Sequence, residues 1–96
     1  MTLKELTEYL HKSVGYKFYM RKNNEYSVYG FTDIFKGYLR EEKGKFYLFI
    51  HANYTNAILN HSKIKHKCII CYKPLRYSCH AIHEISLQQD KESYSE

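Results

Sequence analysis

Three cysteines and a histidine in the second half of the chain are the residues whose spacing suggests the most specific chemistry. Cys68 and Cys71 form a C-x-x-C pair, and Cys79 and His83 follow soon after it. Zinc in proteins takes four nitrogen or sulfur ligands in a tetrahedron, and a C-x-x-C pair commonly supplies two of them. Cys68, Cys71, Cys79 and His83 are therefore candidate zinc ligands, and zinc is the one cofactor that this sequence suggests.

Two features nevertheless favour buried core cysteines over a zinc site. The C-x-x-C pair lies in an apolar, strand-like run without the glycine or proline that usually shapes a zinc knuckle. Strict alternation along a strand would also place Cys68 and Cys71 on opposite faces of the sheet. Because cysteine is among the most frequently buried residues, we expect neither a bound metal nor another cofactor.

The histidines provide no clear catalytic arrangement. The minor alternatives are a thiolate nucleophile at Cys79 beside His80, and a ribonuclease-like general base at His51 or His61. Residues 43–83 contain no Asp or Glu that could orient such a histidine. The glycine-rich phosphate loop and the H-E-x-x-H and G-x-S-x-G motifs are absent as well. We therefore expect a binding protein without catalytic residues.

The distribution of charge is the main functional signal. The chain of 96 residues has fifteen Lys and Arg against ten Asp and Glu, a formal charge of +5. The carboxylate-free segment 43–83 should have a positive potential that attracts phosphate or carboxylate, and its tyrosines add planar faces on which a base can stack. The residues expected to bind an anionic ligand are Lys63, Lys65, Lys67, Lys73, Arg76, Tyr54, Tyr72, Tyr77 and His51.

The lysine comb formed by Lys63, Lys65 and Lys67 has two interpretations. On one face of a strand, the three ammonium groups would either bind phosphates or protect a sheet edge from aggregation. The favoured function is capture of nucleic acid or a nucleotide signal, with an acidic protein surface as a further partner class. The alternative is an inhibitor that binds a host protein through an apolar patch, stabilised by zinc; Phe31, Phe35 and Tyr38 are candidates for this patch.

Composition indicates the cellular setting. Abundant Lys, Tyr, Asn and Ile with few Ala, Pro and Gly suggest AT-rich coding DNA, as in a phage or mobile element that counters a host system. An odd number of cysteines favours a reducing compartment. No apolar run approaches the roughly 18–20 residues of a membrane span, and the N-terminus lacks a signal-peptide pattern. We expect a cytoplasmic protein without a membrane partner, and we leave homo-oligomerisation open.

The elements that must position these residues follow from hydrophobic periodicity. A capping box at Thr2-Leu3-Lys4-Glu5 and an apolar stripe at spacings of three and four predict an amphipathic helix over 2–14, ended by Gly15. After Gly15, apolar and polar residues alternate with a period of two, which predicts strands. Residues 52–62 are compatible with a short helix or a long loop. The predicted strands are 16–21, 26–31, 34–41, 45–51, 64–72 and 75–87.

This order predicts an α+β fold. An N-terminal amphipathic helix precedes about five or six short antiparallel strands, which form a twisted sheet or a small, partly open barrel. Residues 1–87 are expected to make a single compact domain. The polar residues 88–96 are expected to form a frayed tail.

Overall fold

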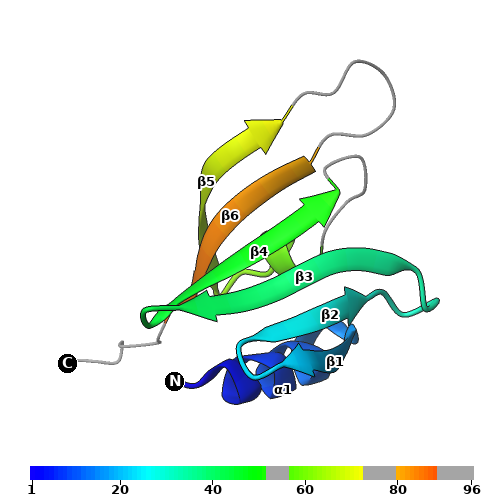
Figure 1. The fold of residues 1–96 in the computed structure, drawn as a ribbon. Helices are drawn as coiled ribbons and strands as arrows, with labels where there is room; N and C mark the ends of the chain where they lie inside the picture. The colour runs from blue at the N-terminus through cyan, green and yellow to red at the C-terminus, as the bar shows by residue number, and fades with distance from the viewer. Residues whose placement is uncertain (52–56, 73–79, 89–96) are drawn as a thin grey trace.

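A computed structural model describes residues 1–51, 57–72 and 80–88, with the side chains of residues 51, 70–72 and 80 outside that description. The fold is α+β, as predicted: helix α1 (Leu3–Val14) is followed by six antiparallel strands in one open sheet (Figure 1). The strands are β1 (Lys17–Lys22), β2 (Glu25–Tyr29), β3 (Phe35–Glu42), β4 (Lys45–His51), β5 (Ile64–Tyr72) and β6 (His80–Leu87). A short helix, α2 (Ala57–Asn60), precedes β5.

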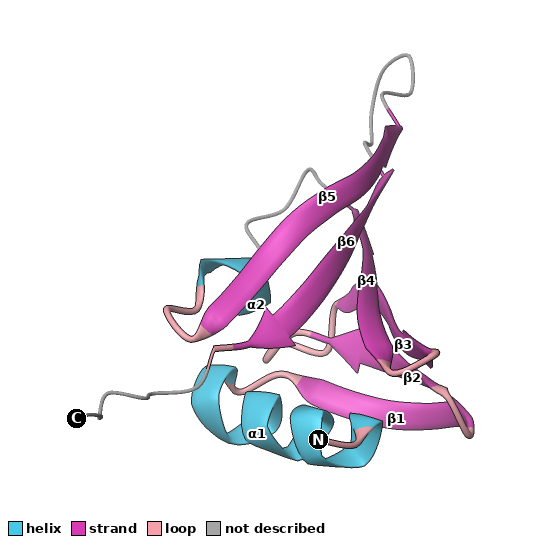
Figure 2. Ribbon diagram, turned by 90° about the vertical axis from the view of Figure 1, so that its left-hand side faces the viewer, coloured by secondary structure: helices cyan, strands magenta, loops and turns pink. Residues whose placement is uncertain are grey.

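The strands lie in the order β1-β2-β3-β4-β6-β5, so β1 and β5 form the two edges. Figure 2 shows the strong twist of the sheet, in which β1 and β5 run in clearly different directions. The sheet is open, which decides between the twisted sheet and the barrel that the sequence left as alternatives. None of the helices in the described part of the chain is long and apolar enough to cross a membrane.

Helix α1 begins with the predicted capping box. The Glu5 amide donates to the Thr2 hydroxyl at 3.1 Å, and the Thr2 amide donates to the Glu5 carboxylate at 2.8 Å. At the other end, Gly15 has a φ of 81° and its amide donates to the His11 carbonyl. Both ends of α1 are therefore fixed by residues next to it in sequence.

Replacing Thr2 by alanine should lower the free energy of unfolding by about 1 kcal/mol, because the hydroxyl that accepts from the Glu5 amide is lost. Ser13→Ala, on an exposed position of the same helix, is the matched control and should have little effect. Urea denaturation followed by circular dichroism measures both. Equal losses in the two variants would show that the cap contributes nothing specific.

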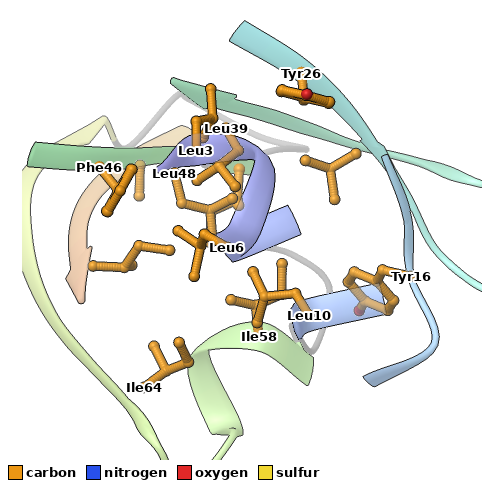
Figure 3. Close-up of a cluster of buried hydrophobic side chains, with 14 residues drawn as sticks. Leu3, Leu6, Leu10, Tyr16, Tyr26, Leu39, Phe46, Leu48, Ile58 and Ile64 are labelled. Atoms are coloured by element: carbon orange, nitrogen blue, oxygen red, sulfur yellow. The ribbon is translucent and has the colours of Figure 1, made fainter. Parts of the chain in front are cut away.

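The core lies between the two helices and one face of the sheet (Figure 3). Leu6 and Leu10 of α1, Leu39 of β3, Leu48 of β4 and Ile58 of α2 are fully buried. The register pairs Leu39 with Leu48 directly across β3 and β4. Alternation then places the neighbours of these strand residues on the opposite side of the sheet, which we call the open face because no described helix covers it.

The hairpin between β3 and β4 has the predicted turn. Lys43 and Gly44, with φ values of 53° and 79°, make the two-residue connection between the two strands.

A bulge interrupts the pairing of β5 with β6. It separates Cys68, paired with His83, from Ile70, paired with Ile82. Cys71 then pairs with Ala81, so the backbone register departs at the bulge from the strict alternation on which the expectation of opposite faces for the two cysteines rested.

Parts of the predicted elements lie outside the described residues. These parts are residues 52–56, the turn at residue 73 onward with the start of the predicted last strand at 75–79, and the tail at 89–96. Within the described chain, the last strand begins at His80. Of the two alternatives for residues 52–62, a short helix or a long loop, residues 57–60 form a short helix.

Candidate functional site

Aromatic side chains line up on the open face across β1 to β4. The register connects Tyr19 with Ser27, Ser27 with Tyr38, and Tyr38 with Phe49, one residue from each strand. Leu39, the neighbour of Tyr38 in β3, is fully buried in the core, so Tyr38 and its cross-strand partners belong to the opposite face. The sheet therefore presents aromatic rings where no helix covers it.

Edge-to-face contacts connect four rings of β1, β2 and β3 in a continuous series, which Phe49 of β4 extends as the cross-strand partner of Tyr38. The ring centroids lie 5.6 Å apart for Tyr19 and Tyr29, 5.5 Å for Tyr29 and Phe35, and 5.1 Å for Phe35 and Tyr38. Such contacts are favourable and leave part of each ring face open. We call Tyr19, Tyr29, Phe35, Tyr38 and Phe49 the aromatic row; Tyr19 is its most exposed described member, at 56%.

Two arginines stack on the aromatic row. The guanidinium carbon of Arg21 lies 4.7 Å from the ring centroid of Tyr38, and that of Arg40 lies 4.7 Å from the ring centroid of Phe49. A planar cation over a ring face is attracted by the ring quadrupole. The open face therefore combines flat apolar surfaces with flat positive ones.

A buried carboxylate fixes both arginines. Glu25, whose side chain is only 3% exposed, accepts from Arg21 at 2.9 Å and from Arg40 at 2.7 Å and 2.8 Å. The two guanidinium groups compensate the burial of its charge. Their own side chains are 48% and 32% exposed. Arg21 reaches solvent with donors that Glu25 does not use, whereas the remaining guanidinium nitrogen of Arg40 lies 3.6 Å from the Glu42 carboxylate.

The predicted lysine comb is only partly formed. Lys65 and Lys67 are exposed on the edge strand β5, where they pair with Ser86 and Glu84. Because Glu84 pairs in turn with Tyr47 on β4, these two lysines share the open face with the aromatic row. Lys63 lies in the turn before β5, so only Lys65 and Lys67 of the predicted comb are strand residues.

Carboxylates moderate the positive charge elsewhere on this face. Asp33 binds the Lys17 ammonium at 2.7 Å, and this hydrogen bond raises the pKa of Lys17. Glu84 lies 4.0 Å from Lys45 and opposite Lys67. Lys65 faces an uncharged serine across the ladder, which makes the β5 edge a more positive part of the open face.

Most of the other residues predicted to bind an anion lie outside the described part of the chain. They are Lys73, Arg76, Tyr54 and Tyr77, together with the side chains of His51 and Tyr72. The backbone register does place His51 and Tyr72 in one row, on either side of His80 in β6. Among the predicted zinc ligands, Cys79 and the side chain of Cys71 are also outside the described residues.

A histidine pair lies between β5 and β6. The Nδ1 atoms of His66 and His83 are 3.3 Å apart, and their ring centroids are 5.1 Å apart. Burial lowers the pKa of His83, and the neighbouring His66 lowers this pKa further. Among the side chains that the structure describes, no three His, Cys, Asp or Glu residues form a ready-made metal site.

A groove of about 820 Å³ runs between α1 and the free edge of β1. Thr7 and Lys12 line it from the helix, and Phe18 and Tyr19 line it from the strand. Since Tyr19 also begins the aromatic row, the groove adjoins the open face at the edge of the sheet.

Most of the aromatic row and both stacked arginines were not predicted from the sequence. Unbalanced charge singles out other segments, because Glu25 lies close enough in sequence to Arg21 to balance it. Phe35 and Tyr38 were predicted only as part of an apolar patch. The usable signal was Lys17-x-Tyr19-x-Arg21: basic and aromatic residues alternate on the side of β1 that faces away from the core.

No family model, curated protein or solved structure matches this chain. The functional argument therefore depends on the geometry of the open face.

Proposed function

We propose that this protein binds single-stranded nucleic acid on the open face of its sheet. The observation that supports the proposal is the aromatic row with the Arg21 and Arg40 guanidinium groups stacked on it. Unpaired bases stack on aromatic rings and on guanidinium planes, and this stacking tolerates different base sequences.

The extent of this surface favours a strand over a single nucleotide. The aromatic row crosses four strands, and Lys65 and Lys67 continue the same face on the far edge strand β5. A mononucleotide needs enclosure by a pocket, whereas a strand can follow an open surface and contact it repeatedly. Single strands are preferred over a duplex because paired bases hide their faces in the helix stack.

Phosphate binding would come from residues on the same face. Arg21 retains donors beside the rings that Glu25 does not use, and guanidinium groups bind phosphate in a planar, two-point geometry. Lys65 and Lys67 add point charges at the β5 edge. In this arrangement the bases contact the aromatic row while the backbone runs along the cations.

Replacing Tyr19 by alanine should weaken binding of a single strand about tenfold, which corresponds to the loss of one base stack. Tyr19 is exposed, so its removal should leave the fold intact. Fluorescence anisotropy with a labelled single-stranded DNA or RNA of mixed sequence measures the effect.

Met20→Ala is the matched control, because Met20 is equally exposed on the same strand but pairs on the other side of the sheet. It should bind as the wild type does. A duplex of the same sequence should bind more weakly than the single strand. If Tyr19→Ala and Met20→Ala bind alike, or if the duplex binds best, stacking on the aromatic row is not the mode of binding.

Exposed apolar residues after β2 favour protein binding as a second candidate function. Phe31 is 68% exposed and Ile34 is 51% exposed, in the connection between β2 and β3. Large apolar side chains at the surface are typical of protein interaction sites when they cluster. Capture of a partner that is lost in Phe31→Ser but retained in Tyr19→Ala, with no binding of single strands at low salt, would favour this candidate.

A further inference from the structure

The two imidazoles of His66 and His83 have the spacing of metal ligands. Their Nδ1 atoms are 3.3 Å apart. Two nitrogens bound to one tetrahedral zinc ion at about 2.0–2.1 Å lie about 3.3–3.4 Å from each other. The pair therefore already has the separation that two corners of a zinc tetrahedron require.

Cys68 is placed to supply a third ligand. It pairs directly with His83 across the β5–β6 ladder, and it is exposed two residues after His66 on the same strand. Residues two apart in a strand share a face, so all three side chains begin on one side of the sheet. The cysteine side chain has three staggered positions about its Cα–Cβ bond, and its exposure leaves room to turn.

We propose that His66, His83 and Cys68 bind a zinc ion between β5 and β6. His66 and His83 would bind through Nδ1 and Cys68 through its thiolate after rotation of its side chain, with water in the fourth position. This set differs from the candidate ligands in the sequence pattern, since His66 takes part and neither Cys71 nor Cys79 is required. The site is independent of the proposed nucleic-acid surface.

The chemistry of the three donors favours zinc over harder cations. Imidazole and thiolate are borderline and soft ligands, whereas Mg²⁺ and Ca²⁺ prefer carboxylate and carbonyl oxygen. In the part of the chain that the structure describes, neither imidazole has a carboxylate partner that would account for the pairing as part of a charge network. Without metal the two nitrogens are within hydrogen-bonding distance of each other, and a zinc ion bound by both would replace this hydrogen bond while keeping their separation.

Cobalt is the probe that distinguishes this set of ligands. The purified full-length protein, stripped with a chelator and kept reduced, should take up Co²⁺ with the visible bands of tetrahedral cobalt and a near-ultraviolet thiolate band. Zn²⁺ should displace the cobalt and remove both signals. His66→Asn and His83→Asn should each weaken binding at least about tenfold, the scale on which even residues that merely support metal ligands act.

The cysteine variants separate the two possible ligand sets. Cys68→Ser should lose the thiolate band, while Cys71→Ser and Cys79→Ser should keep it. Circular dichroism of each variant without metal checks that the fold is retained, so that lost binding reports a lost ligand. Absence of cobalt binding by the wild type, or binding that depends on Cys71 and Cys79 but not on His66, would overturn the proposal.

Discussion

Replacing Gly37 by alanine should lower the free energy of unfolding by about 3–5 kcal/mol, enough to unfold a small domain. Gly37 has a φ of 146°, which side chains rarely allow. A Cβ atom there would lie 1.8 Å from the Phe49 carbonyl oxygen and 2.9 Å from its carbon. Both are backbone atoms of β4, so relief of the clash requires separating β3 from β4, where Gly37 pairs with Ile50.

Gly44→Ala is the control for backbone strain without a clash. Gly44 has a φ of 79°, but nothing lies within 4 Å of an added Cβ. Its cost should be about 1–2 kcal/mol, from the left-handed conformation alone. Urea denaturation of the two variants compares them directly. Similar losses would show that β3 and β4 do not approach as closely at Gly37 as the structure has them.

The close approach at Gly37 also bears on the candidate binding surface. Gly37 is adjacent to Tyr38, which lies at the centre of the aromatic row and under the Arg21 guanidinium. A substitution that separates β3 from β4 would therefore also separate Tyr38 from Phe49, its cross-strand partner. Loss of single-strand binding by a Gly37 variant would follow from loss of the fold and could not be assigned to the site.

Reversing the charge of Lys65 and Lys67 together should weaken single-strand binding on the order of a hundredfold at low salt. Both side chains are exposed on the open face and neither contributes to the core. Each lost phosphate contact should also reduce the slope of log K against log salt concentration by about 0.7 for a single strand. Anisotropy titrations of Lys65→Glu/Lys67→Glu across a salt series measure both quantities.

Lys4→Glu/Lys43→Glu makes the same change in net charge elsewhere on the protein. Lys4 is exposed on helix α1 and Lys43 in the hairpin turn between β3 and β4, and neither belongs to the aromatic row or lines the groove beside Tyr19. The variant should bind with nearly the wild-type salt slope, because its lysines contact no phosphate. If both double variants weaken binding equally, the ligand responds to the net charge of the protein and the lysines of β5 have no special part.

The parts of the fold that were predicted correctly depend on neighbours in sequence. The capping box at Thr2, the stop at Gly15 and the hairpin at Gly44 each involve residues a few positions apart. The pairing of β4 with β6 was not predicted, because pairing between distant strands is chosen by packing over the whole core. The bulge after Cys68 was missed for a similar reason, since it becomes visible only against its partner strand.

In the candidate site too, features that depend on neighbours in sequence were predicted, and features that depend on pairing between strands were not. Exposure of Lys65 and Lys67 followed from their alternation with His66 on a polar edge. Arg21 and Arg40 were overlooked because a count of charge along the chain cancels them against neighbouring acids. Only the folded structure reveals that a single carboxylate, Glu25, binds both arginines, whose guanidinium carbons lie over the rings of Tyr38 and Phe49. Cross-strand geometry of this kind is not encoded in linear spacing.

The buried Glu25 has a consequence for selectivity. Its negative charge partly cancels the long-range field of Arg21 and Arg40 while leaving their planes in place. A polyanion without bases, such as heparin, gains mainly from that field, whereas a nucleic acid also gains from contact with the rings. We therefore expect Arg21 and Arg40 to favour a nucleic acid over heparin, because the field that attracts both polyanions is weak beside Glu25 and only a nucleic acid also gains from contact with the rings.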